Sequence, residues 1–118
     1  MTDQATFRIR ERSGVPVVEV IGELDISNVD DLRSFLRELD VENTAAVIFD
    51  LEHISYLDSH GLQVLVELNQ RLHTTRRQLL VVASRETPPG KLVRAANLHL
   101  ALKLFESMDE ALLSLPSR

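Results

Sequence analysis

The chain has 118 residues, of which 44% are hydrophobic and 26% charged, a composition that suits one globular domain and excludes a disordered chain. Its formal net charge of −5 argues against nucleic acid or an anionic membrane as the main partner. The absence of cysteine excludes disulfides, thiolate catalysis and cysteine metal sites, and it fits a cytoplasmic protein.

The first third of the sequence predicts a hairpin followed by a helix. Apolar and charged residues alternate over 6–11, and an apolar run over 15–21 follows the Ser13-Gly14 turn signal. Residues 29–39 then carry apolar side chains at helical spacing, with Ser27 placed to cap the helix start.

The remaining two thirds alternate apolar strands with helical patterns. Thr87 followed by Pro88, and Ser107 followed by Glu110, are signals of helix starts. Residues 50–58 read as a loop with scattered apolar residues. We expect strands at 45–49, 79–83 and 102–105, and helices at 59–74, 87–97 and from 108 onward. This β-β-α-β-α-β-α-β-α order predicts an α/β fold with right-handed crossovers and a small, mixed but mostly parallel sheet.

Several functional classes lack their sequence signals. No stretch approaches the roughly 18 apolar residues of a membrane span, and residues 1–9 lack the apolar segment of a signal peptide. The four histidines contain no pair at the i, i+4 spacing of a helical metal site, and the four glycines are too isolated for a phosphate loop. We therefore predict no metal, no cofactor and no membrane or nucleic-acid partner.

Asp58, Ser59 and His60 are consecutive, which brings a catalytic triad to mind. Triad residues must converge on one another, whereas neighbours at a helix start point in different directions. A nucleophile elbow also needs glycine two residues before the serine, where Leu57 stands. We predict no catalytic residue and no enzyme.

The helix over 59–74 has an apolar arc of roughly 200°, wider than one buried stripe requires. It either packs against both the sheet and a neighbouring helix, or presents part of the arc to a partner protein. Its first residue, Ser59, also has two interpretations. Asp58 and Ser59 are either simple capping residues, or Ser59 accepts a phosphate at the positive end of the helix dipole.

Two motifs carry a resemblance to a known family. The segment Asp58-Ser59-His60-Gly61-Leu62 resembles the Asp-Ser-Ser/Thr-Gly-Leu signature of STAS domains, and Gly22-Glu23-Leu24-Asp25 resembles the motif that closes the second strand in that family. The sequence is most similar to the stand-alone anti-sigma factor antagonists of bacteria. The resemblance covers nearly the whole chain, so we expect a single STAS domain over 1–118 with a core at about 6–115, and helices mainly on one side of the sheet.

The resemblance implies a phosphorylation switch rather than catalysis. The serine after the aspartate, here Ser59, is the residue that an anti-sigma factor with serine kinase activity phosphorylates in such relatives. In such relatives the unphosphorylated protein binds that kinase and frees a sigma factor. The phosphorylated protein dissociates from the kinase, and a phosphatase returns it to the unphosphorylated form. His60 departs from the motif, because an imidazole replaces the second small hydroxyl residue.

The expected partner-binding residues surround this serine. They are Asp58, His60, Gly61, Glu23 and Asp25. For the last two, ordinary loop and cap chemistry is an equal interpretation. Alternative functions are a STAS subunit of a lipid-transport ATPase or stress-sensing assembly, and a small-ligand-binding STAS domain.

Overall fold

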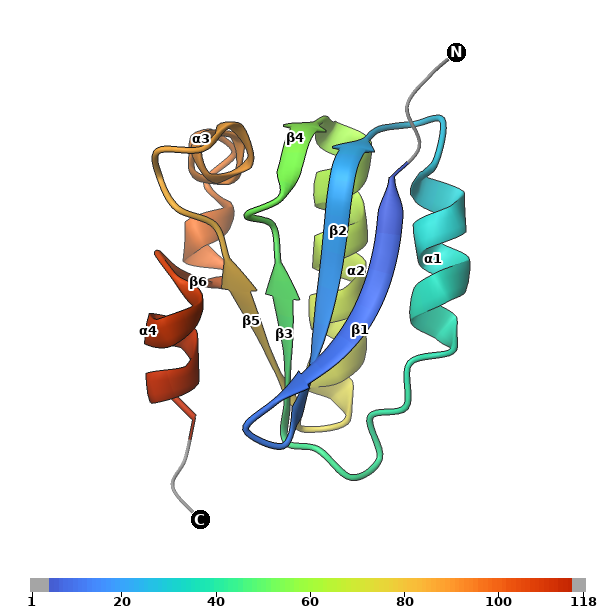
Figure 1. The fold of residues 1–118 in the computed structure, drawn as a ribbon, viewed down its shortest axis with the longest axis vertical. Helices are drawn as coiled ribbons and strands as arrows, with labels where there is room; N and C mark the ends of the chain where they lie inside the picture. Colours follow the sequence, from blue (N-terminus) through green and yellow to red (C-terminus); the bar gives the residue numbers. More distant parts are fainter. Residues whose placement is uncertain (1–4, 116–118) are drawn as a thin grey trace.

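A computed structural model describes residues 5–115 as a mixed sheet with four α-helices (Figure 1). Residues 1–4, which belong to the 1–9 segment without a signal-peptide pattern, lie outside this range. The strands are β1 Thr6–Arg12, β2 Val15–Leu24, β3 Ala46–Asp50, β4 Ile54–Leu57, β5 Gln78–Val82 and β6 Lys103–Phe105. The helices are α1 Val29–Arg37, α2 Ser59–Thr74, α3 Pro88–Ala95 and α4 Met108–Leu113, with a short 3₁₀ helix η1 at Leu98–Leu100.

The sheet is mostly parallel, as the sequence predicts. Its order is β1-β2-β3-β5-β6, and only the β1–β2 hairpin is antiparallel. The ten-residue strand β2 has two parallel partners, since residues 17–19 pair with β3 and residues 22–24 pair with β4. A register shift between Gly22 and Glu23 lies within the segment paired with β4.

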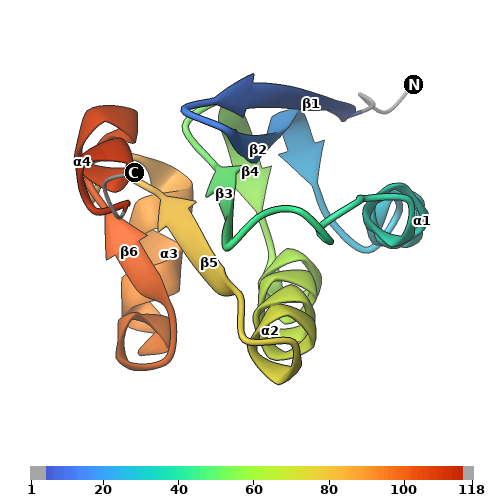
Figure 2. The ribbon, with the colours of Figure 1, turned by 90° about the horizontal axis from the view of Figure 1, so that it is seen from below.

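Helices cover the two faces of the sheet unequally. The larger apolar core lies between one face and helices α1, α2 and α3, whereas α4 packs on the opposite face through Met108, Ala111 and Leu112. Figure 2 shows α4 on the other side of the strands from α2. The expectation that helices lie mainly on one side is confirmed. Within residues 5–115, no helix combines the length and apolarity of a membrane span.

The wide apolar arc of α2 is explained by two packing partners within the domain. Its buried side chains join the sheet core, and its flank contacts α1. Arg71 donates hydrogen bonds to the carbonyls of Leu36 and Leu39 at 2.8 and 3.2 Å, which satisfies acceptors at the end of α1. Arg33 pairs with Glu67 at 2.9 Å across the same helix contact. The first interpretation of the arc is therefore confirmed for its buried residues.

Two local predictions were wrong. Residues 54–57 form strand β4 rather than loop, because their backbone pairs with the end of β2. Ser27 does not cap α1, since the N-cap position belongs to Asn28 and the Ser27 hydroxyl donates to the Asp25 carboxylate at 2.6 Å. By contrast, the predicted caps Thr87 and Ser107 accept hydrogen bonds from backbone N–H groups three residues on.

Candidate functional site

The start of α2 is organised by one carboxylate. Asp58 is the N-cap, and its Oδ1 accepts hydrogen bonds from the backbone N–H groups of His60 and Gly61 at 2.9 and 3.2 Å. These bonds satisfy two of the donors that a helix leaves unpaired at its first turn. The cap fixes the backbone so that Ser59, the first helical residue, is exposed to solvent.

The same carboxylate joins the two sequence motifs. Asp58 Oδ2 accepts the backbone N–H of Ile26 at 3.3 Å, and the Asp58 N–H donates to the carbonyl of Leu24 at 3.3 Å. Gly61 completes the junction, because a Cβ at that position would lie 2.3 Å from Leu57 Cδ1 and 3.1 Å from Leu24 Cδ2. The second motif therefore supports the first through backbone bonds and close packing.

His60 lies beside the capping residue Asp58 and helps to lower the pKa of its carboxyl group. Its Nδ1 is 3.3 Å from Asp58 Oδ2, and 48% of its side chain is exposed. Partial burial acts to raise the pKa of Asp58, but hydrogen bonds from the Gly61 N–H and from the ring and N–H of His60 outweigh it and lower that pKa. The Asp58 carboxylate is thereby held in its charged form next to Ser59.

The corner formed by the second motif lies next to this helix start, but its acidic residues differ in role. The Asp25 Oδ1 accepts both the N–H and the hydroxyl of Ser27, so this oxygen shapes the turn before α1. Glu23 pairs with Tyr56 in the β2–β4 ladder and is half-buried. The structure thus brings both residues to the Ser59 end of the sheet. For Asp25 it shows hydrogen bonds within the loop, which was one of the two interpretations from the sequence.

Two exposed apolar residues near the helix start were missed from the sequence. Ile26 is 65% exposed and Tyr56 is 51% exposed. The Ile26 N–H bonds to Asp58, and Tyr56 lies on β4 two residues before Asp58. Their exposure depends on the β2–β4 pairing, which the sequence pattern did not predict. Together we call Ile26 and Tyr56 the apolar rim.

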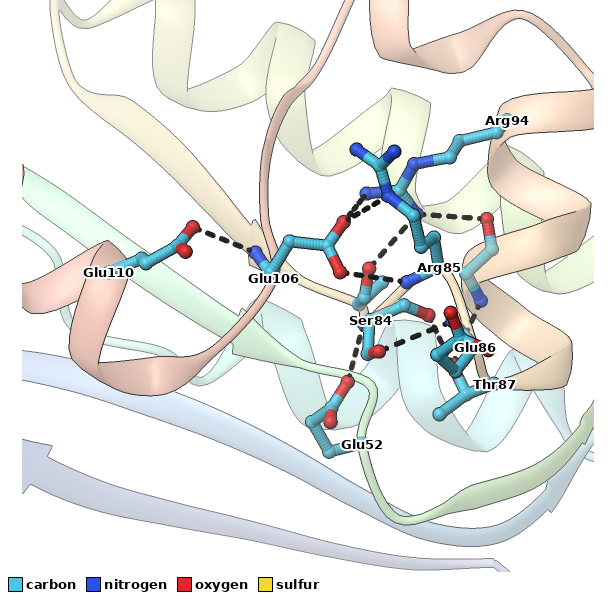
Figure 3. Close-up of polar contacts among 10 residues, drawn as sticks. Glu52, Ser84, Arg85, Glu86, Thr87, Arg94, Glu106 and Glu110 are labelled. Atoms are coloured by element: carbon cyan, nitrogen blue, oxygen red, sulfur yellow. Dashed lines mark hydrogen bonds and ion pairs between the residues drawn. The ribbon is translucent and has the colours of Figure 1, made fainter.

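The start of α3, which follows β5, is a second helix N-terminus that contrasts with the start of α2. Thr87 caps this helix. In the loop before it, the N–H of Ser84 donates to Glu52 Oε2 at 2.7 Å. The Glu106 carboxylate accepts bonds from Arg85 and Arg94 at 2.8–3.1 Å (Figure 3). These bonds connect the loop before α3 with the end of β6, so the polar groups there are engaged within the domain.

Comparisons with known proteins agree with this architecture. The STAS domain family profile matches residues 6–111. The anti-sigma-F factor antagonist RsfB of Mycobacterium tuberculosis is 24% identical over 93% of this chain and 88% of its own length.

Solved structures show the same fold. The crystal structure of an anti-sigma factor antagonist from Mycobacterium paratuberculosis superposes with a TM-score of 0.83, at 24% identity over 94% of this chain and 93% of that chain. The anti-sigma factor antagonist SpoIIAA in its unphosphorylated form gives a TM-score of 0.64, at 16% identity over 92% of this chain and 94% of that chain. With the family profile spanning nearly all of the described residues, and with both motifs joined at the start of α2, the chain belongs to the STAS domain family.

Proposed function

We propose that this chain is an anti-sigma factor antagonist that acts by binding, and that phosphorylation of Ser59 switches the binding off. The proposal is carried by one observation: Ser59 is exposed at the first position of a helix whose cap, Asp58, is already satisfied within the domain. The names of the similar proteins supply the partner class, an anti-sigma factor. The serine kinase activity of that partner is part of the proposal.

The switch follows from charge. A phosphate on Ser59 adds about −1.5 to −2 charges at the positive end of the α2 dipole, where the fold tolerates negative charge. A partner covering the same surface would instead have to bury that charge or face it, next to the ionised Asp58. Phosphorylation therefore weakens docking without unfolding the antagonist, and a phosphatase reverses it.

The apolar rim supplies the contact area for docking. Exposed aromatic and aliphatic side chains beside a charged centre are typical of the residues that dominate binding at protein interfaces. The Ile26 N–H bonds to Asp58 and Tyr56 lies two residues before Asp58, so we expect a partner that reaches Ser59 to contact both. Glu23, Asp25, His60 and Gly61 form the surrounding polar contacts in this proposal.

The experiment uses the chain as bait and compares Ser59→Ala and Ser59→Glu with the matched pair Ser55→Ala and Ser55→Glu. Ser55 is also exposed and lies on the adjacent strand β4. The captured kinase is incubated with ATP, and phosphate on the bait is read from its intact mass. We expect wild type and Ser59→Ala to capture the anti-sigma factor, only wild type to gain one phosphate, and Ser59→Glu to capture much less.

The Ser55 variants should behave like wild type. Tyr56→Ala and Ile26→Ala should weaken capture, whereas Leu113→Ala, which removes an 84% exposed side chain on α4, should leave it unchanged. Equal phosphate gain by Ser59→Ala would disprove the assigned acceptor. Stable capture of a transport ATPase in place of a sigma-factor regulator would overturn the proposed partner class.

A further inference from the structure

A second group of ionisable side chains lies on the α4 side of the sheet. Glu19 of β2 and Asp50 of β3 are direct register partners in the parallel ladder, and His53 follows in the turn before β4. One nitrogen or oxygen from each of the three lies within 4.8 Å of those of the other two. Both carboxylates are buried, with residue exposures of 4% and 6%, in a domain that otherwise buries few charges.

Within residues 5–115, one oxygen of each carboxylate accepts hydrogen bonds and the other accepts none. Glu19 Oε1 accepts bonds from Arg8 at 2.9 and 3.2 Å, whereas its Oε2 is 3.5 Å from His53 Nε2. Asp50 Oδ1 accepts the Glu52 N–H at 2.9 Å. Among residues 5–115, no donor bonds Asp50 Oδ2, and Asp50 lines a cavity of about 160 Å³ together with Glu19 and His53.

His53 lies near the buried Asp50 carboxylate, with one nitrogen within 4.8 Å of one of its oxygens, but the two residues form no ion pair. No lysine, arginine or histidine nitrogen within residues 5–115 lies within ion-pair distance of its carboxylate. A buried anion in this position gains stability from a bound cation.

We propose that Glu19 Oε2, Asp50 Oδ2 and His53 Nε2 bind a divalent transition-metal ion such as Zn²⁺. Two carboxylate oxygens and one imidazole nitrogen are ligands that such ions accept, at about 2.0–2.2 Å. Two ligand atoms at that distance in tetrahedral geometry are roughly 3.4 Å apart, close to the 3.5 Å between Glu19 Oε2 and His53 Nε2. Arg8 and the Glu52 N–H hold the remaining oxygens, as outer-shell partners do in metal sites.

No metal site was predicted from the sequence because its histidines form no pair at the i, i+4 helical spacing. These ligands come instead from two neighbouring strands and a turn, and only the β2–β3 register brings them together. The cavity has space for water to complete the coordination. Two arginines, Arg10 and Arg12, also line it, and Arg10 lies 3.8 Å from Glu19 Oε1. Their positive charges oppose the cation and limit its affinity.

The test is titration of the chain with Co²⁺, followed by visible absorption, with Zn²⁺ as competitor. We expect one Co²⁺ per chain and a higher melting temperature with Zn²⁺, since a ligand that binds the native state stabilises it. His53→Gln and Asp50→Asn should weaken binding at least as much as loss of an outer-shell partner, about 10- to 100-fold. His53→Gln is the decisive variant because 56% of its side chain is exposed, so folding should be unaffected.

Arg10→Gln should act in the opposite direction and tighten binding, because it removes a positive charge beside the cation. His73→Gln, at an exposed histidine on α2, and His99→Gln, at an exposed histidine on η1, are the matched controls and should bind as wild type does. The proposal is overturned if wild type shows neither a Co²⁺ spectrum nor a Zn²⁺-dependent rise in melting temperature. It is equally overturned if either control weakens binding as much as His53→Gln.

Discussion

The starts of α2 and α3 are two capped helix N-termini that follow strands β4 and β5. Asp58 caps α2 and leaves Ser59 and His60 exposed, and both residues of the apolar rim are exposed as well. Thr87 caps α3, but proline occupies its first position and the loop before it is bonded to Glu52 and Glu106 (Figure 3). A similar local signal thus gives an accessible helix end in one case and an internally bonded one in the other, depending on what the neighbouring elements supply.

The largest expected effect is the loss of stability when a methyl group is added at the start of α3. A Cβ at Gly90 would lie 1.9 Å from the Ser84 carbonyl oxygen, which belongs to backbone and cannot swing away. We expect Gly90→Ala to lower the free energy of unfolding by about 3 kcal/mol or more, measured by urea denaturation. A loss below about 1 kcal/mol would mean that the loop before α3 is less constrained than its hydrogen bonds indicate.

Gly61→Ala is the counterpart at the start of α2 and should cost less. The new Cβ meets the ends of the Leu57 and Leu24 side chains, which can shift by rotamer changes. We expect a loss of about 1–2 kcal/mol in the same measurement. If Gly61→Ala proved more costly than Gly90→Ala, the corner at α2 would be the more rigid of the two regions.

The two caps should contribute similar amounts to stability. Asp58→Ala and Thr87→Ala each remove an acceptor for first-turn N–H groups, and we expect a loss of about 1 kcal/mol for each. Asp58→Ala should in addition speed amide hydrogen exchange at Ile26, because the N–H of that residue bonds to Asp58 Oδ2. Unchanged exchange at Ile26 would show that the two motifs are not coupled through this carboxylate.

The smallest effect is a pH dependence confined to the α2 cap. Because the pKa of Asp58 is lowered in the folded protein, its stabilising contribution is present above the unfolded pKa, about 3.9, and is lost as pH falls through the folded pKa. Asp58→Asn keeps an acceptor oxygen but not the charge. The stability difference between wild type and this variant should therefore shrink as the pH falls from 5 to 2 in urea titrations, and a constant difference would contradict the assignment.

Most residues with a local sequence signal were placed correctly, with Ser27 as the exception, whereas residues placed by pairing between distant segments were not. The alternation of Phe7 and Ile9 with arginines predicted β1, and the Thr87-Pro88 and Ser107–Glu110 signals predicted two helix starts. Strand β4 was missed because it has four residues and its central Ser55 and Tyr56 are exposed, which leaves no apolar run.

The same contrast between local signals and distant pairing explains which parts of the candidate site were predicted from the sequence. Asp58 and Ser59 carry a capping pattern that is visible in one segment. The apolar rim depends on where β2 and β4 bring Ile26 and Tyr56, and the Glu19–Asp50 contact depends on strand register. Single-sequence patterns contain neither relation.

Strand β2 pairs with β3 in its middle and with β4 at its end, so one continuous strand runs from the centre of the core to the corner beside Ser59. The residues that we propose to face a partner, such as Ile26, Tyr56 and His60, are exposed on this frame and contribute little to the core. Their replacement would alter recognition at little cost in stability. A duplicated gene of this kind has a short evolutionary route to a new partner, since a few surface changes redirect the module while the frame stays the same.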